Sequence, residues 1–103
     1  MYVRLWRFRP KPGSETAFLE AYGPQGSWAR LFATAPGFLG TELLLAEGSQ
    51  PFYLTCDRWV NQASWRAFLE TSRAAYDQLD RDTEGLVVEE TEIGAFHPLP
   101  DHT

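Results

Sequence analysis

Residues 58–79, RWVNQASWRAFLETSRAAYDQL, join the end of one predicted element to the whole of the next. Apolar and aromatic residues in the second part recur at intervals of three and four, which is typical of one face of an α-helix. Asn61 precedes this pattern and is suited to cap the helix. The predicted buried stripe comprises Trp65, Phe68, Leu69, Ser72, Tyr76 and Leu79. A strand ending near Trp59 therefore passes directly into a long amphipathic helix.

Upstream of this junction, the sequence predicts one strand and two short helices. Residues 2–9 are rich in aromatic and aliphatic side chains and meet a PKPG sequence, which ends a strand. Ser14 is predicted to cap the first helix and Ser27 the second. A Gly-Pro pair at 23–24 and a Pro-Gly pair at 36–37 end them. The two helices together form one interrupted helical connection.

The remaining segments have strand character. Residues 38–46 and 52–60 are separated by a Gly-Ser-Gln-Pro turn, so we expect an antiparallel hairpin. Gly85 ends the long helix, and residues 86–96 form the last predicted strand. Residues 98–103 carry no structural pattern and are predicted to be a flexible tail.

The order strand, split helix, strand, strand, helix, strand is that of an α+β, ferredoxin-like split β-α-β domain. Its expected core is a four-stranded antiparallel sheet with helices on one face. The chain has 103 residues, which suffices for a single domain over residues 1–103. Aromatic residues make up 15% of the sequence, and so short a chain must cover many large flat side chains.

Charge and composition exclude several classes of function. The net charge is -5 and the basic residues are scattered, which argues against nucleic-acid binding. No apolar run is long enough to span a membrane, and Cys56 is the single cysteine, so we expect a cytoplasmic protein. No metal-ligand spacing, phosphate-binding loop or dinucleotide fingerprint is present. We therefore expect no metal and no nucleotide cofactor.

Both faces of the predicted sheet carry large apolar residues, although helices of the same chain can cover only one of them. In the strand around residue 56, Tyr53, Thr55 and Trp59 alternate with Leu54 and Cys56. The alternation leaves open which of these two sets is covered. An apolar surface left in water favours association. We therefore predict a homodimer in which the two sheets meet face to face.

Three segments resemble the antibiotic-biosynthesis monooxygenase family. They are the junction at 58–79, with its RW pair and the helix WRAFLETSRAAY, the sequence APGFLGTELL at 35–44, and the final strand EETEIGAF at 89–96. The resemblance covers nearly the whole chain and implies a dimeric α+β barrel with a small-molecule pocket between sheet and helices. It also implies oxygenation without metal or flavin in some members, with aromatic polyketides such as anthrones as one substrate class and heme as another.

The resemblance also implies candidate catalytic residues. A Trp, a Tyr and an Asn are tied to the chemistry of quinone-forming members, and Trp65, Tyr76 and Asn61 are the most similar positions here. The same residues also suit ordinary roles, because aromatics at helical spacing are more often core and Asn61 is a good helix cap. Heme-degrading members use a histidine from this helix, whereas the histidines here are His97 and His102. We therefore expect no heme cofactor.

Four further residues are candidates for substrate binding. Arg7 supplies a charge in the first strand, Tyr22 and Trp28 flank the break between the short helices, and Phe68 lies on the long helix. All three aromatics also fit a plain core. The leading hypothesis is a cofactor-independent monooxygenase acting on a small aromatic or enolisable molecule. The alternative is a non-catalytic dimer that binds a hydrophobic small molecule, and a heme-degrading relative is a third, less favoured hypothesis. A carboxylate, a tyrosine and an arginine converging in one pocket would favour catalysis over binding alone.

Overall fold

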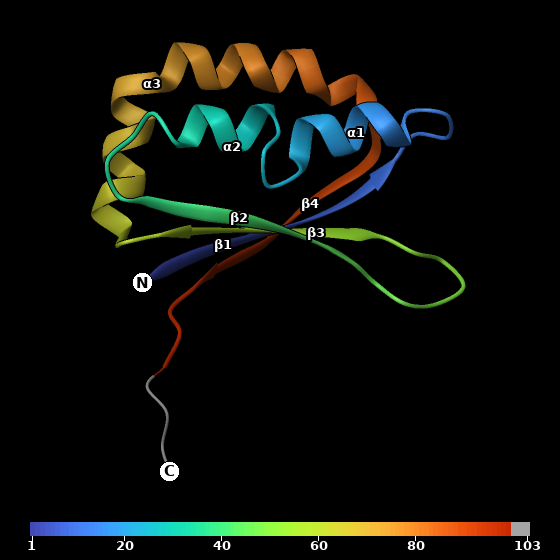
Figure 1. Ribbon diagram of the computed structural model, residues 1–103, viewed down its shortest axis with the longest axis horizontal. Coiled ribbons are helices and arrows are strands. Elements are labelled where there is room, and N and C mark those ends of the chain that lie inside the picture. Colours follow the sequence, from blue (N-terminus) through green and yellow to red (C-terminus); the bar gives the residue numbers. More distant parts are fainter. Residues whose placement is uncertain (100–103) are drawn as a thin grey trace.

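A computed structural model describes residues 1–99 and shows one sheet with its helices on one side (Figure 1). The strands are β1 (Tyr2–Pro10), β2 (Phe38–Leu45), β3 (Tyr53–Trp59) and β4 (Val87–Phe96). The helices are α1 (Glu15–Tyr22), α2 (Ser27–Phe32) and α3 (Gln62–Thr83), and a short 3₁₀ turn, η1 (Glu84–Leu86), leads into β4. The predicted order of elements is confirmed.

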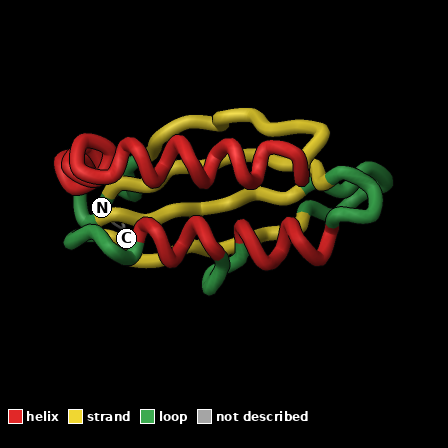
Figure 2. Tube along the Cα trace, turned by 90° about the horizontal axis from the view of Figure 1, so that it is seen from above, coloured by secondary structure: helices red, strands yellow, loops and turns green. Residues whose placement is uncertain are grey.

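The four strands form one antiparallel sheet in the order β2-β3-β1-β4. Seen from above, α3 runs beside the line formed by α1 and α2, and both lie over the strands (Figure 2). This is the predicted ferredoxin-like α+β fold. Each helical connection, from β1 to β2 and from β3 to β4, leads into an edge strand of the same sheet.

The junction at 58–79 folds as its pattern predicts, with one departure. The Asn61 side chain accepts a hydrogen bond from the Ser64 amide at 2.8 Å, which confirms the cap. Ser72 has non-helical angles (φ -122°, ψ 22°), so α3 consists of two segments that meet at a bend (Figure 1). Trp65 therefore lies on the first segment and Tyr76 on the second.

Strand alternation divides the sheet into two surfaces. The covered face, beneath the helices, carries Tyr2, Arg4, Trp6 and Phe8 from β1 and Tyr53, Thr55, Asp57 and Trp59 from β3. The open face carries Val3, Leu5 and Arg7 from β1, Leu54, Cys56 and Arg58 from β3, and Glu42 and Leu44 from β2. Trp59 is 0% exposed, so its set is the covered one, and the choice left open by the sequence is resolved.

A bulge in β2 changes the face of one residue. Simple alternation puts Phe38 on the same side as Leu44, but the register shifts between Phe38 and Gly40. Gly40 has φ +145°, a conformation that favours glycine. Phe38 consequently pairs with Trp59 and packs against its ring at 5.1 Å on the covered face. The sequence pattern alone assigns Phe38 wrongly, because a bulge inserts one residue into the alternation.

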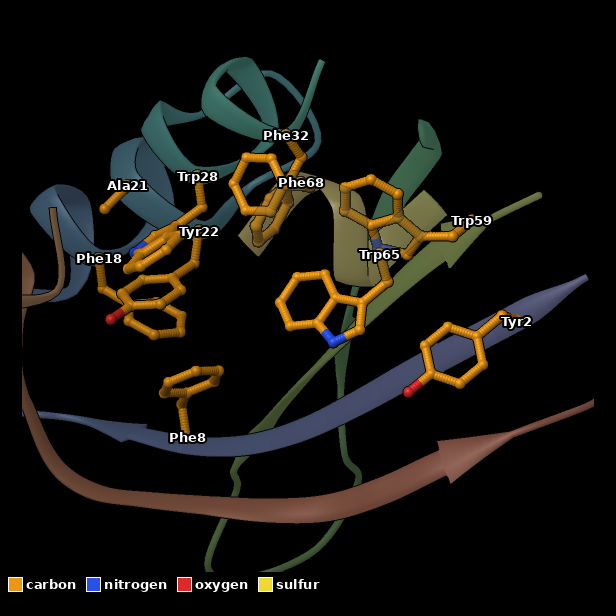
Figure 3. Close-up of a cluster of buried hydrophobic side chains, with 10 residues drawn as sticks. All are labelled: Tyr2, Phe8, Phe18, Ala21, Tyr22, Trp28, Phe32, Trp59, Trp65 and Phe68. Atoms are coloured by element: carbon orange, nitrogen blue, oxygen red, sulfur yellow. The ribbon is translucent and has the colours of Figure 1, made fainter. Parts of the chain in front are cut away.

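The core between sheet and helices is built almost entirely of aromatic rings (Figure 3). Its members are Tyr2, Phe8, Phe18, Ala21, Tyr22, Trp28, Phe32, Trp59, Trp65 and Phe68. Tilted and edge-to-face pairs dominate, as between Phe32 and Trp59 at 5.6 Å. The high aromatic content of the sequence is thus mostly used to fill one layer.

Cys56 is a free, buried cysteine on the open face. Within residues 1–99, no helix is both long and apolar enough to cross a membrane. Of the predicted tail, Pro98 and Leu99 belong to no helix or strand, and residues 100–103 lie outside the described residues.

Candidate functional site

A cavity of about 190 Å³ lies between the covered face of the sheet and the helices. It is smaller than the roughly 300–1,000 Å³ of sites for drug-sized ligands, so it suits a compact molecule. Strand residues form its floor and helix residues its walls. The lining consists of Arg4, Trp6, Phe8, Tyr22, Trp28, Phe32, Thr55, Asp57, Trp65, Tyr76, Asp80 and Glu90.

The walls are aromatic and come from all three helices. The ring of Trp28 meets Tyr76 edge-on at 5.0 Å, and Tyr76 in turn meets Trp65 at 6.3 Å. Tyr22 packs on Phe8 from the floor at 4.5 Å. In Figure 3, the indole of Trp65 projects from α3 toward β1. These rings give the cavity an aromatic lining.

Arg4 brings a positive charge into this aromatic cavity. Its guanidinium lies 4.3 Å from the ring centre of Trp65, in cation–π geometry. It also donates to the Tyr2 hydroxyl at 3.2 Å and pairs with Glu92 at 3.0 Å. The Arg4 side chain is only 14% exposed. These contacts hold the guanidinium in a fixed place beside the cavity.

Asp57 lies opposite Arg4 in the β1–β3 register and brings a carboxyl group to the floor. It is 9% exposed and accepts a hydrogen bond from the Thr41 hydroxyl at 2.6 Å. Burial raises the pKa of Asp57 from 3.8 to about 6, although the Thr41 hydrogen bond and the charge of Arg4 both act to lower it. The group is therefore a carboxylate at neutral pH that can accept a proton.

Two more carboxyl groups, Asp80 on α3 and Glu90 on β4, line the cavity. Burial raises the pKa of Glu90, and the nearby negative charges of Asp80 and Glu84 raise it further. Burial also raises the pKa of Tyr76, with Asp80 adding to the effect and Arg4 opposing it. Neither Asp80 nor Glu90 forms a salt bridge with any residue in 1–99.

Tyr22 and Trp28 are held in place by one hydroxyl group. Both the Tyr22 hydroxyl and the Trp28 Nε1–H donate to Thr83 Oγ1 at 3.2 Å, and Thr83 donates to the Leu79 carbonyl. Burial raises the pKa of Tyr22 to about 12, so its phenol stays protonated at neutral pH. This network fixes α1 and α2 to the end of α3, and it makes these two rings rigid walls.

Of the seven candidate residues from the sequence, four line this cavity: Trp65, Tyr76, Tyr22 and Trp28. Phe68 packs directly behind them, stacked on Trp65 at 5.8 Å and 2% exposed, as a core residue that supports the wall. The helical spacing of the junction thus brings Trp65 and Tyr76 to one site. These aromatics are core residues and cavity-lining residues at once, because the cavity is a gap within the aromatic core. Their role in binding or catalysis stays a prediction.

The remaining two candidates lie elsewhere. Asn61 caps α3 and lines a separate surface depression with Ser64. Arg7 lies on the open face, where its guanidinium covers the Phe52 ring at 3.7 Å and pairs with Glu89 at 3.2 Å. The odd–even alternation of β1 explains the difference, because it turns Arg7 away from the helices and Arg4 toward them.

Four charged residues line the cavity that were not among the candidates from the sequence: Arg4, Asp57, Asp80 and Glu90. A signal for the first two was present. Arg4 alternates in phase with Tyr2, Trp6 and Phe8, and Asp57 alternates in phase with Tyr53 and Trp59. A charged residue in phase with buried aromatics is costly unless it has a partner or a function, so these positions stand out once the covered face is known.

Comparison with protein families gives one match. The model of the family described as antibiotic biosynthesis monooxygenase matches residues 1–75, which is more than half of the chain. The chain belongs to the antibiotic biosynthesis monooxygenase family. The family expected from the resemblance is thereby confirmed. A search of curated protein sequences found no significant match.

Solved structures with the same fold include members of this family. A variant of SnoaB, a cofactor-independent oxygenase from Streptomyces nogalater, superposes with a TM-score of 0.70 at 18% identity, over 97% of this chain and 94% of that one. A MhuD variant with two manganese protoporphyrin IX bound per active site gives 0.66 at 17% identity, over 100% and 99%. PA3566 from Pseudomonas aeruginosa gives 0.63 at 14%, over 96% and 94%. At these identities the likeness concerns the fold alone.

Heme is one substrate class that the resemblance to the antibiotic biosynthesis monooxygenase family implies. The residues that line this cavity do not fit it. None of the described lining residues is a histidine. His97 lies beyond the end of β4, with its ring 5.7 Å from Tyr2.

Proposed function

We propose that this protein is a monooxygenase that oxidises a small aromatic or enolisable molecule with O₂, the substrate itself supplying the electrons. One observation carries the proposal: a carboxylate, a tyrosine and an arginine (Asp57, Tyr76 and Arg4) line the same aromatic cavity. The flat walls suit an aromatic substrate. The polar groups suit removal of a proton and stabilisation of the resulting anion.

The proposed reaction converts an acidic methylene group into a carbonyl group. Loss of one proton leaves an electron pair on the substrate as an enolate. The enolate carbon forms a bond to one oxygen atom of O₂, and protonation gives a hydroperoxide. Loss of the second C–H proton together with hydroxide breaks the O–O bond and yields the ketone and water. Both electron pairs come from the two C–H bonds, and one oxygen atom remains in the product.

The alternative is a dimer that binds a hydrophobic molecule without changing it. A passive binding site gains nothing from Asp57, because an ionised carboxyl group that is 9% exposed weakens both folding and apolar binding. Perturbed carboxyl groups of this kind gather at sites of chemistry. The convergence of Asp57 with Arg4 and Tyr76 therefore favours catalysis.

The proposal is tested with anthrone, a tricyclic ketone with an acidic methylene group, incubated with and without air. We expect one O₂ consumed for each anthrone oxidised. Arg4→Gln should lower kcat/KM at least tenfold, because the guanidinium lies at the cavity. The matched control Arg66→Gln removes the same group from the exposed surface of α3 and should stay within twofold. Equal conversion without oxygen, or no conversion of anthrone and simpler phenols, would contradict the proposal.

The functional unit we propose is a homodimer in the cytoplasm, formed through the open face. Leu44 and Phe96 on this face are 47% and 45% exposed. The face also carries charges of both signs, including the ion pair between Arg58 and Glu42. A second copy of the chain, rotated by a two-fold axis, presents the same mixture and can match apolar to apolar and positive to negative.

A further inference from the structure

We propose that Asp57 is the proton acceptor of the cavity and that the substrate enters as a neutral weak acid, a phenol, enol or activated methylene compound, rather than as an anion. The inference rests on the proposed function and names its base and its substrate class. It is carried by the position of Asp57, by its single hydrogen-bond partner and by the charges that surround the cavity.

The first observation is the geometry of the Asp57 carboxyl group. It stands on the central strand β3, at the floor of the cavity, and is nine-tenths buried. Within residues 1–99 it accepts one side-chain hydrogen bond, from the Thr41 hydroxyl to Oδ1. A carboxylate has capacity for several such bonds. Oδ2 is thus available for a group inside the cavity.

The second observation is the balance of charge around the cavity. Three carboxyl groups line it, Asp57, Asp80 and Glu90, and Arg4 alone among the described lining residues is basic. Arg4 is itself paired with Glu92. An anionic substrate would meet repulsion from the carboxylates before it reached the floor. A neutral acid meets no such barrier, and it then has to lose its proton inside.

The groups packed around Asp57 decide whether it can take this proton. Arg4 on β1 favours the carboxylate, and Tyr76 and Asp80 on α3 and Glu90 on β4 lie along the same cavity. Toward the cavity, α2 contributes the uncharged rings of Trp28 and Phe32. Glu42 and Arg58 lie on the open face, where they pair with each other.

The proton transfer is balanced within the site. An O–H or C–H bond of the substrate breaks and an O–H bond forms on Asp57, so the negative charge moves from the carboxylate to the substrate. The total charge of the cavity does not change, and no ion has to cross the aromatic walls. The new anion then lies in the same cavity as the Arg4 guanidinium, which stabilises it.

The experiment separates this proton transfer from oxidation. Anthrone is incubated with the protein in deuterated water without oxygen, and mass spectrometry follows deuterium entering its methylene group above the uncatalysed background. We expect the unmodified protein to accelerate the exchange. Asp57→Asn, which keeps the shape of the side chain, should slow the accelerated exchange about 100-fold or more. The control Asp77→Asn removes a half-exposed carboxyl group of α3 that pairs with Arg73, and it should leave the exchange unchanged.

A second variant tests the position of the base. Thr41→Val removes the hydrogen bond that favours the carboxylate, so it should move the acid limb of the exchange rate to higher pH. The unmodified protein should lose exchange activity as the pH falls through about 6, where Asp57 becomes protonated. Asp57→Asn should lack this limb. A purely structural role of Asp57 would produce neither the shifted acid limb of Thr41→Val nor the missing limb of Asp57→Asn.

The outcomes distinguish the two proposals. Full exchange by a folded Asp57→Asn variant would overturn the role of Asp57, even if oxidation in air persists. Exchange that depends on Asp57, without any consumption of O₂ in air, would support the base and overturn the oxygenase. Tighter binding of an anthrone carboxylate than of anthrone itself would overturn the preference for a neutral substrate. Fluorescence of the cavity tryptophans measures this binding.

Discussion

The two faces of the sheet are made of the same four strands, yet each carries a different unfavourable feature. One buries a charged group, and the other leaves apolar side chains exposed to water. The covered face buries an aromatic layer and, within it, a carboxyl group that would be more stable in water. The open face leaves large apolar side chains such as Leu44 exposed and keeps its charges in pairs. The cost of burying charge falls where we propose chemistry, whereas the open face, where we propose a second subunit, leaves Leu44 and Phe96 nearly half exposed.

This difference follows from alternation alone. In β1, Arg4 and Arg7 are an even and an odd residue of one strand, and they serve different surfaces. Arg4 has Trp65 and the cavity beside it, whereas Arg7 has Phe52 and Glu89. The role of a charged strand residue can therefore be assigned only when the face of the sheet on which it lies is known.

Among substitutions that test the difference between the two faces, we expect the largest loss of stability at Trp59. Trp59→Ala removes a ring that is 0% exposed and contacts Phe32, Phe38 and Trp65. We expect a loss of about 3–5 kcal/mol in the free energy of unfolding, enough to unfold much of the population of a small domain. Urea denaturation followed by circular dichroism measures it.

The matched control on the open face is Phe96→Ala. Phe96 is 45% exposed, so less apolar area is lost, and we expect about 1 kcal/mol or less for the isolated chain. Equal losses for Trp59→Ala and Phe96→Ala would mean that the two faces are covered alike.

The second effect concerns assembly. Leu44→Arg places a charge on the open face, at a position already 47% exposed, so the fold should survive while the proposed dimer weakens by on the order of 100-fold. Leu19→Arg makes the same change on α1, at 44% exposure, and should leave the dimer intact. Sedimentation velocity at micromolar concentration compares the two. A monomeric unmodified protein would end the dimer hypothesis.

Much of this contrast was predictable from the sequence. The order of elements, the cap at Asn61 and the aromatic stripe with Trp65 and Tyr76 follow from local rules: turn residues, capping and helical spacing. These rules operate within a few residues of each position. Strand alternation is also a local rule, and it correctly separated the two faces of β1 and β3.

The remainder depends on contacts between distant segments. The bulge beside Phe38 and the bend at Ser72 leave no clear local pattern in the sequence, and the bulge changes the face on which Phe38 lies. The polar part of the site needs β1, β3, α3 and β4 to be assembled before Arg4, Asp57 and Glu90 meet. Sequence reasoning therefore found the aromatic walls and missed the charged groups.

The smallest expected effect is a gain in stability when the Asp57 carboxyl group on the covered face is removed. Burial raises the pKa of Asp57 from 3.8 to about 6, so ionisation of this group opposes folding. The cost is absent well below pH 3.8, where the group is protonated in both states, grows as the pH rises from 3.8 to about 6, and is complete above that.

Asp57→Asn should thus stabilise the protein at pH 7 by about 1–2 kcal/mol, below the ceiling of roughly 3 kcal/mol set by linkage. The gain should vanish well below pH 3.8, whereas Asp77→Asn, at a half-exposed position of α3, should change stability by less than about 0.5 kcal/mol at either pH. Thermal unfolding at the two pH values measures both variants. A loss of stability at pH 7 would show that the Asp57 carboxylate holds the fold together and would remove the stability argument for its function. A gain combined with lost proton exchange would show stability given up for activity at one buried group.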